Sequence, residues 1–449
     1  MTTIQQGAKK AWGYRWVILT VLWLLYIINY FDRISVLTFL PLIRKDLNLS
    51  HEEIGFAASI FFFAYAVAQF TAGYLADKFG PKKVMGIAIV VFTAITFLTG
   101  LVRNYTQFVV LRLGLGLGEG HHFTPACKAI SEWFPKNEKG RATAFFSTTW
   151  AFAPAVIPII VTFLAQALDG DWRTVFFLLA VPGLLGMFLL WYFVADKPET
   201  MLEKGRMSKD EYDYIKAGLV SDQKAVDKLG RWFFLKDSSL WMYAMQQFFL
   251  LAVFWGSTTW ISSFLYEQHG FSLKAMGALA ALPYAVAIVS TMTGGWLMDK
   301  VFHRTRPVAL ISFVASIPIL FYLGQVPKGD TGTLIIMLIL NGFFLNMIWG
   351  VIYAYPQMRY PKEALGSALG FASTIGQMGA FLSPLAAGYL VQKTATGANY
   401  GNVFYMFAGC CVLGAIVTLL LNEKTIDIEE LTGKKADDAA ADVEEVFVK

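Results

Sequence analysis

The chain has 449 residues, of which 56% are hydrophobic, 16% are aromatic and 15% are charged. Soluble proteins carry about 25% charged residues, and a mean hydropathy of +0.52 leaves more apolar surface than a water-soluble fold can bury. The net charge of +5 is small, and the three cysteines (Cys127, Cys410 and Cys411) are too few for a disulfide scaffold and lack zinc-site spacing. The composition therefore predicts an integral membrane protein built from helices.

Twelve stretches are apolar and long enough to cross a membrane. A spanning helix needs about 20 mostly apolar residues, because the hydrocarbon core is about 30 Å thick. Most of the connecting loops are short, so successive helices are expected to be antiparallel neighbours. The predicted spans are 16–43, 53–76, 83–102, 106–131, 140–166, 172–195, 239–265, 273–298, 306–325, 332–358, 364–391 and 401–421.

One longer polar segment divides these spans into two sets. Residues 196–238 separate an N-terminal six-helix bundle (1–195) from a C-terminal six-helix bundle (239–421). An acidic tail follows at 422–449, and its composition predicts a solvated end with no chemistry of its own.

Lysine and arginine set the expected orientation. If both termini are cytoplasmic, most of the 37 Lys and Arg residues lie on the cytoplasmic side, as the positive-inside rule requires. The first span is too long for a cleaved signal peptide and contains Asp32 and Arg33. With no organelle-targeting presequence, we expect a multi-pass protein of a bacterial inner membrane. We expect it to be a monomer in the lipid bilayer, with no nucleic-acid partner.

The two halves of the chain repeat each other. The sequence GYLADKFGPKK at 73–83 recurs as GWLMDKVFHRTR at 295–306, in the same place after the second helix of each half. The sequence at 134–145 also pairs loosely with that at 360–371. Two pseudo-symmetric bundles with a binding site between them are typical of transporters that rock between two states.

The segment 73–83 resembles the cytoplasmic loop motif G-x-L-a-D-[RK]-x-G-[RK]-[RK] of the major facilitator superfamily, and the twelve spans extend this resemblance over the whole chain. Within the superfamily, NYFDR (29–33) and RLGLGLGEG (112–120), followed by Pro125 and SEWFP (131–135), resemble the anion:cation symporter family. That family includes galactonate, hexuronate, glucarate and phthalate permeases and the sialic acid and vesicular glutamate carriers. The resemblance implies the major facilitator fold and transport of an organic anion.

Charged side chains inside the first six spans independently indicate an anion carrier. Such groups are costly in a membrane and usually face a cavity or a partner. Asp32, Arg33 and Arg112 fall in roughly one layer of the outer half, and Glu119 lies deeper, seven residues after Arg112. Arginine offers a planar fork matched to a carboxylate, whereas a partly dehydrated carboxylate readily takes up a proton. We therefore expect an anion carrier coupled to protons; structural ion pairs, Arg112–Glu119 and Asp32–Arg33, are the alternative.

The resemblance implies specific roles at the matching positions. Arg33 resembles the ligand of the substrate carboxylate, Asp32 and Glu119 resemble the protonation pair, and Arg112 would couple them. Tyr30 resembles a polar residue of the cavity.

Other residues near these charges have competing interpretations. Lys128 is expected to snorkel or to pair with Glu132, and His122 is a candidate proton relay that could equally serve helix packing, as could His121. The alternating glycines from Gly114 to Gly120 lie in an apolar helix with no preceding strand, so they predict close helix packing and no nucleotide site. No enzyme, metal or ATP-binding motif emerges, and we expect no cofactor other than the coupling proton.

The second half offers uncharged candidates for the substrate. Ser373 and Gln377 are the main ones, and they stand where the symporter family commonly has two asparagines. This departure counts against the usual sugar-acid substrates, and Trp150 with the many Phe and Trp residues would suit a flatter or more apolar acid. Further polar candidates are Gln246, Gln247, Asn341, Asn346 and Thr374.

The repeated loops carry a set of charges at the cytoplasmic rim. We expect them to act as a latch that closes this side in the outward-open state, without touching substrate. The predicted latch comprises Gly73, Asp77, Lys82, Lys83, Asp299 and Arg304.

These features together predict a proton-coupled symporter that imports a small organic anion, a sugar acid or another carboxylate, by alternating access. An anion exchanger is the first alternative, in which two arginines would hold phosphate, as in the organophosphate:phosphate antiporters. A transporter-like metabolite receptor is the second alternative, although no signalling domain is appended to the spans.

Overall fold

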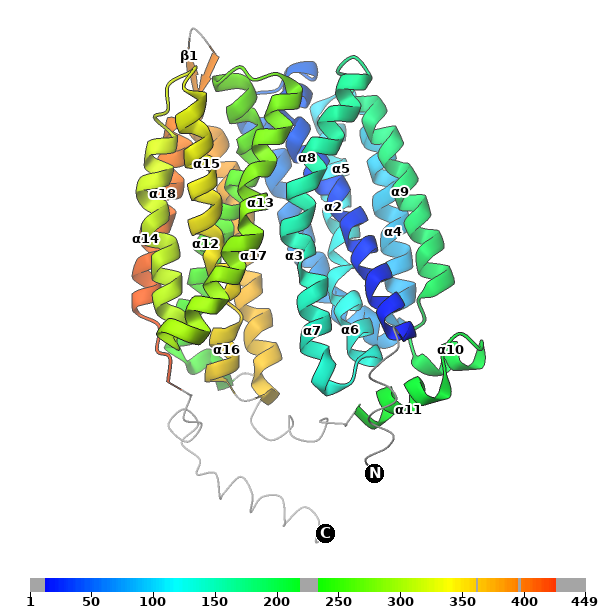
Figure 1. Cartoon of the computed structure of the whole chain (residues 1–449). Coiled ribbons are helices and arrows are strands. Elements are labelled where there is room, and N and C mark those ends of the chain that lie inside the picture. The colour runs from blue at the N-terminus through cyan, green and yellow to red at the C-terminus, as the bar shows by residue number, and fades with distance from the viewer. Residues whose placement is uncertain (1–12, 219–232, 361, 395–396, 425–449) are drawn as a thin grey trace.

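The computed structural model describes residues 13–218, 233–360, 362–394 and 397–424. It is almost entirely helical and forms two bundles that stand side by side (Figure 1). Most of the predicted tail at 422–449 lies outside the described residues. The predicted architecture of twelve spans in two bundles is confirmed, with breaks inside several spans that the sequence did not predict.

The first bundle contains six crossing segments. They are α2 (Tyr14–Asp46), α3 (His51–Phe79), α4 (Pro81–Thr99), α5 (Tyr105–Gly120) with α6 (Phe123–Trp133), α7 (Lys136–Ser147) with α8 (Thr149–Ala167), and α9 (Trp172–Phe193). The short helices α10 (Pro198–Glu203) and α11 (Lys209–Gly218) follow.

The second bundle contains the other six segments. After η2 (Phe233–Lys236) they are α12 (Ser238–Ser263) with η3 (Phe264–Gln268), α13 (Leu273–Leu297) with η4 (Met298–Phe302), α14 (Thr305–Leu323), α15 (Thr331–Asn346) with η5 (Met347–Gly350) and α16 (Ala354–Arg359), α17 (Lys362–Leu390) and α18 (Gly401–Leu419). A short antiparallel hairpin, β1 (Gln392–Thr394) and β2 (Gly397–Asn399), joins α17 to α18.

Ten helices of the described chain are each long and apolar enough to cross a membrane. The other two crossings are made by α17 and by the broken pair α5 and α6. The expected continuous span 106–131 is therefore wrong in detail, because the chain leaves the helix at His121 and His122 before α6 begins.

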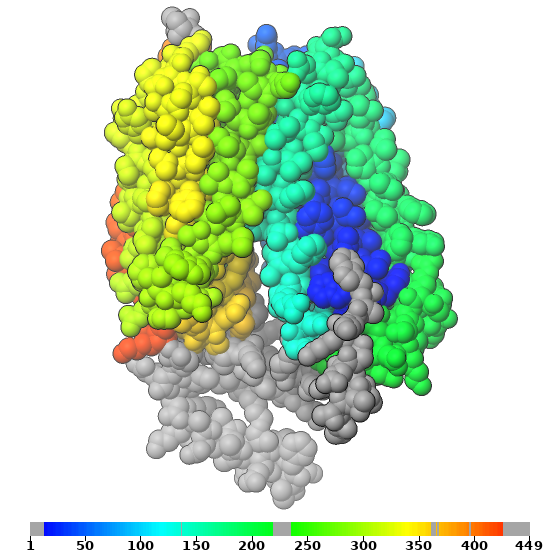
Figure 2. Space-filling model, in the orientation of Figure 1, coloured from blue at the N-terminus to red at the C-terminus, as the bar shows by residue number. Residues whose placement is uncertain are grey.

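The two ends of the bundles differ in how they meet. We call the end where α2 begins and α18 ends the terminal face, and the opposite end, which carries the hairpin, the distal face (Figure 1). The bundles touch through α3 with α17, α8 with α13, and α2 with α12. Figure 2 shows them in contact toward the distal face and separated by a cleft toward the terminal face.

Close backbone packing inside the first bundle comes from the glycines of α5. A Cβ atom at Gly120 would lie 2.7 Å from the carbonyl oxygen of Tyr65 on α3, and one at Gly118 would lie 3.1 Å from Val91 on α4. The first distance leaves no room for a side chain and the second is tighter than an ordinary contact, so the prediction that these glycines serve helix packing is confirmed. The packing fixes the charged residues of α5 against α2 and α3.

Candidate functional site

The centre of the first bundle holds a buried ion pair between Arg33 on α2 and Glu119 on α5. Arg33 donates to Glu119 Oε2 through Nε at 3.0 Å and through Nη2 at 2.8 Å. The two side chains are 3% and 0% exposed, so lipid and water are excluded from the pair. Glu119 Oε1 is buried without a hydrogen-bond partner among the described residues. Arg33 thus forms a buried ion pair with one oxygen of Glu119, while the other oxygen lacks a hydrogen bond.

Aromatic rings surround the Arg33 guanidinium. Its Cζ lies 4.6 Å from the ring centre of Tyr65, 4.9 Å from Phe61 and 5.1 Å from Tyr30. A fourth ring, that of Trp255 on α12, lies at 5.3 Å and comes from the opposite bundle. Cations are attracted to ring faces at these distances. Tyr30 therefore lies against the Arg33 guanidinium, and Trp255 is a neighbour that was not among the predicted site residues.

Asp32 is adjacent to Arg33 but takes no part in this ion pair. Successive residues of a helix point about 100° apart, so the two side chains face different neighbours. Asp32 is 3% exposed, and its Oδ2 atom has no hydrogen-bond partner in the described part of the chain. It is a buried carboxyl group with no ion pair to a cation recorded there.

Arg112 lies beside the pair and is also incompletely bonded. Its Nε donates to the carbonyl oxygen of Ala57 on α3 at 3.3 Å, and its guanidinium lies 4.5 Å from the ring of Phe61. Both terminal nitrogens are buried without a partner among the described residues. Neither of the ion pairs considered from the sequence, Arg112–Glu119 or Asp32–Arg33, is formed; Arg33 pairs with Glu119 instead.

The two histidines after Glu119 occupy the break between α5 and α6. His122 is fully buried between the rings of Tyr26 and Phe92, at 5.7 Å and 6.1 Å, and neither ring nitrogen has a hydrogen-bond partner in the described chain. His121 instead bonds Thr71 at 3.0 Å. The structure thus places His122, and not His121, inside the bundle on the terminal-face side of Glu119.

The uncharged candidate residues of the second half differ in whether their polar atoms have hydrogen-bond partners. Ser373 and Gln377 are both half-buried on α17, and no hydrogen bond is recorded for either within the described residues. Gln246 donates to Thr418, and Asn346 donates to the carbonyl oxygen of Gly342, so these amides already have structural partners. Gln247 Nε2, Asn341 Oδ1 and Asn346 Oδ1 are buried without one in that part of the chain.

The predicted latch residues lie at the terminal face, where the bundles are apart. Asp77 accepts a hydrogen bond from Lys128, so the expected pairing of Lys128 with Glu132 is wrong. Lys82 donates to the carbonyl oxygen of Trp191 at 2.9 Å, in its own bundle. No ion pair to the opposite bundle is recorded for the described latch residues Gly73, Asp77, Lys82, Lys83, Asp299 and Arg304.

A cross-bundle cluster at the distal face was missed by the sequence analysis. Glu267 in η3 accepts hydrogen bonds from Arg44 and His51 of the first bundle, each at 2.9 Å, and from Tyr400 of its own bundle at 2.8 Å. Nearby, Trp260 donates to the carbonyl oxygen of Pro384 at 3.1 Å. The sequence carried no signal for the pairing, because the partners are more than 200 residues apart.

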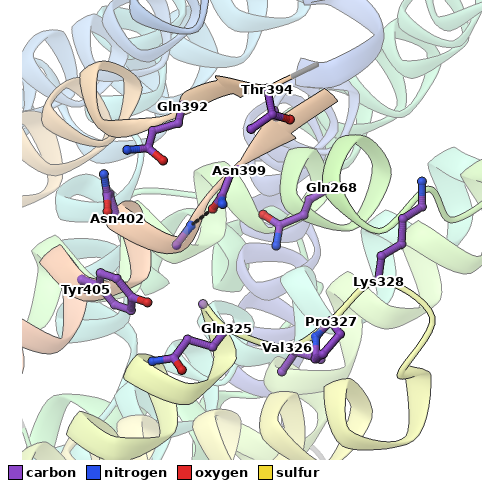
Figure 3. Close-up of a pocket in the computed structure, with 13 residues that line it drawn as sticks. Gln268, Gln325, Val326, Pro327, Lys328, Gln392, Thr394, Asn399, Asn402 and Tyr405 are labelled. Atoms are coloured by element: carbon purple, nitrogen blue, oxygen red, sulfur yellow. Dashed lines mark hydrogen bonds between the residues drawn. The ribbon is translucent and has the colours of Figure 1, made fainter. Parts of the chain in front are cut away.

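A pocket of 610 Å³ opens on the distal face beside this cluster (Figure 3). Five of its thirteen lining residues carry amide side chains, and two of these amides position the chain around Tyr400. Gln268 accepts from the Tyr400 N–H at 2.7 Å, and Asn399 accepts from the Gly401 N–H at 2.8 Å. None of the predicted site residues lines this pocket, so it is distinct from the charged centre around Arg33.

Comparison with known proteins agrees with this architecture. The sequence model described as Major Facilitator Superfamily matches residues 22–328 and 276–444. A probable sulfoacetate transporter of Cupriavidus necator is 30% identical over 91% of this chain and 94% of its own length. A hexuronate transporter of Bacillus subtilis is 24% identical over 90% of this chain and 93% of its own length. A solved bacterial homologue of the human lysosomal transporter Spinster, in an inward-facing and occupied conformation, aligns with a TM-score of 0.73. The alignment covers 91% of this chain and 97% of that structure at 16% identity, so it supports the fold alone.

Proposed function

Because this chain belongs to the Major Facilitator Superfamily and is a membrane transporter, not an enzyme, we propose that it carries a small organic anion into the cell together with protons. Relatives named for sulfoacetate and hexuronate transport support an anionic substrate. In this proposal the protein is a monomer of a bacterial inner membrane, the terminal face is cytoplasmic, and protons are the coupling ions without a further cofactor.

The observation that carries the proposal is the Arg33–Glu119 pair itself. A substrate carboxylate or sulfonate needs the same two N–H groups that Glu119 now occupies. A proton on Glu119 removes its charge and so weakens its hold on Arg33, and the free Oε1 atom is available to receive that proton. Anion binding at Arg33 and proton binding at Glu119 therefore favour each other, which is the thermodynamic requirement for symport.

Asp32 completes the proposed proton chemistry. A carboxyl group buried away from cations is more stable in its neutral form than as an anion, and Asp32 is buried with no recorded ion pair. Asp32 and Glu119 would take up protons on the distal side and release them on the terminal side. Arg112, whose terminal nitrogens are unpaired, would attract Glu119 once the anion has taken Arg33.

The two faces provide the proposed alternation of access. The Glu267 cluster joins the bundles at the distal face, while the cleft opens toward the terminal face. When the bundles rock to the opposite state, the Glu267 contacts must break. The charges around Asp77 and Asp299 would then meet across the closing terminal face as the predicted latch, with Lys82, Lys83 and Arg304.

An exchanger is the second candidate function. The unpaired terminal nitrogens of Arg112 favour it, because Arg33 and Arg112 together offer two guanidinium groups to a multivalent anion such as phosphate. An exchanger requires no proton carrier, so its counterflow would ignore the pH gradient.

Proton-driven uptake into proteoliposomes separates these functions. With the interior alkaline, labelled sulfoacetate, D-glucuronate and aromatic acids are offered in turn, and a protonophore is then added. Accumulation above equilibrium that collapses with the protonophore supports symport. Exchange of internal for external anion without gradient-driven accumulation contradicts it and supports the exchanger.

A further inference from the structure

The charged centre lies almost entirely in the first bundle, yet one residue of the second bundle reaches it. The Trp255 ring on α12 lies 5.3 Å from the Arg33 guanidinium and packs against Phe62 of α3 at 4.9 Å. The side chain is 6% exposed, so it seals Arg33 on the side of the opposite bundle. An anion that replaces Glu119 at Arg33 therefore has Trp255 as an immediate neighbour.

The wall that continues from Trp255 is built from rings. Phe254 lies 5.2 Å from Trp255 and 5.6 Å from Trp349, and Trp349 lies 5.0 Å from Trp150 of the first bundle. These residues come from α12, η5 and α8, so the wall spans both bundles. Rings stack favourably on flat, unsaturated groups but offer almost no hydrogen bonds.

Two hydroxyl groups next to this wall already bond each other. Tyr284 and Thr258 share a hydrogen bond of 2.5 Å, and Thr258 also bonds the carbonyl oxygen of Phe254 at 2.6 Å. The indole N–H of Trp349 is buried without a partner among the described residues. Each substrate hydroxyl buried against these rings would lose its water and gain no hydrogen bond from the rings, which is unfavourable. A hydrogen-bond acceptor on the substrate, in contrast, would pair with the Trp349 N–H.

We propose that Trp255 contacts the substrate and determines specificity, so that the site prefers a planar, unsaturated anion to a polyhydroxylated sugar acid. This inference rests on the proposed function and adds the substrate class to it. Arg33 holds one acidic group, Trp255 stacks on the flat body, and the Trp349 N–H binds a second acceptor. The ring wall excludes hydroxyl-rich molecules because it leaves their hydroxyl groups unpaired.

Two six-carbon dicarboxylates of equal charge test this preference. cis,cis-Muconate is flat and has no hydroxyl groups, whereas D-glucarate carries a hydroxyl on each inner carbon. Binding of each to the purified full-length protein is measured by calorimetry and by competition for uptake in proteoliposomes. We expect muconate to bind at least about tenfold more tightly, since buried hydroxyl groups without partners each weaken binding.

Variants of Trp255 locate the origin of the preference. We expect Trp255→Gln to lower the ratio of muconate to glucarate affinity about three- to tenfold, the amount that one aromatic contact contributes. Trp255→Phe keeps a ring and should retain most of the ratio. Trp241→Phe, on the same helix but 44% exposed, is the matched control and should leave the ratio unchanged.

The outcomes separate this inference from the proposed function. An unchanged ratio in a folded Trp255→Gln protein, shown by a single gel-filtration peak, overturns the role of Trp255. Equal or tighter wild-type binding of glucarate overturns the substrate class, even if uptake is proton-driven. Preference for muconate without any proton-driven accumulation leaves the specificity intact and removes the symport proposal instead.

Discussion

Arg44 of the first bundle donates through Nε to Oε1 of Glu267 in the second bundle, at 2.9 Å. His51 reaches the other oxygen of the same carboxylate at the same distance. The Arg44 ion pair and the His51 hydrogen bond, which join the bundles in the described chain, therefore both end on Glu267, while the central pair Arg33–Glu119 lies within one bundle. One carboxylate thus holds a large share of the polar contact that keeps the distal face closed.

Neutralising Glu267 should open the distal face. We expect Glu267→Gln to raise the reaction of a cysteine placed at Thr162 with an impermeant maleimide by roughly tenfold, because hydrogen bonds to a charged group contribute about 1.5–3 kcal/mol. Thr162 is fully buried and lies in the contact of α8 with Gly277 of α13. Labelling rates in intact vesicles, in a background without the native cysteines, measure the change.

The control for this experiment removes a distal charge that makes no recorded contact. Asp169 lies in an exposed loop with a φ of 54°, a conformation that asparagine tolerates, so Asp169→Asn should not change the labelling rate. Equal rates in Glu267→Gln and Asp169→Asn would show that Glu267 does not hold the distal face.

Glycine packing between α3 and α5 should be sensitive to a single methyl group. A Cβ atom at Gly116 would lie 2.8 Å from the Cβ of Ala64 and would also meet the carbonyl oxygen of Phe61. We expect Gly116→Ala to destabilise the protein by about 1–3 kcal/mol, as overpacking does. A Cβ atom at Gly140 on α7 would meet no other atom of the described chain within 4 Å, so Gly140→Ala should be neutral or stabilising. Thermal unfolding in detergent compares the two, and similar melting temperatures would contradict the packing account.

The fold could be predicted from the sequence because its signals are local and repeated. Hydropathy marks each span, and the loops at 73–83 and 295–306 mark the duplication. Position along a helix also placed Arg33 in one layer with Asp32 and Arg112, and Glu119 deeper in the same bundle. The pairing of Arg33 with Glu119 was not predicted, because depth does not give the rotation of α2 and α5 about their axes, and that rotation decides which neighbour each side chain meets.

The features that the sequence did not reveal depend on longer-range geometry. Trp255 and Glu267 act across the interface of the two bundles, and nothing in the sequence around either residue identifies a partner more than 200 positions away. The break at His121 and His122 is equally hidden, because a pair of residues outside the helix hardly changes the hydropathy of the span. Pairwise contacts between the halves therefore require the structure.

Removing the proton site at Glu119 should separate transport from the proton gradient. Glutamine keeps an oxygen that can accept from Arg33 but cannot take up or release a proton at physiological pH. We expect Glu119→Gln to lose proton-driven accumulation while it retains anion counterflow. Uptake with and without a protonophore measures the first property and isotope exchange measures the second. Glu132→Gln, near the end of α6, is the control and should accumulate normally; full proton dependence in Glu119→Gln would remove Glu119 from the coupling.

The ion pair itself should be visible in the stability of the protein. Arg33→Gln leaves the buried Glu119 carboxylate without its cation, and the loss of one partner of a buried pair costs about 3–5 kcal/mol. The double variant Arg33→Gln with Glu119→Gln removes both charges, so it should recover most of that loss. We therefore expect the melting temperature in detergent to be lowest for the single variant Arg33→Gln.

The relative stabilities of these variants show whether Arg33 and Glu119 pair in the folded protein. A double-mutant cycle subtracts the separate effects of the two substitutions and leaves their interaction, which should be at least about 1 kcal/mol for residues in contact. Arg112→Gln combined with Glu119→Gln serves as the matched cycle, because Arg112 makes no recorded hydrogen bond to Glu119. A larger coupling for Arg112 than for Arg33 would mean that Glu119 pairs with Arg112, and the competition for Arg33 that underlies symport would then be lost.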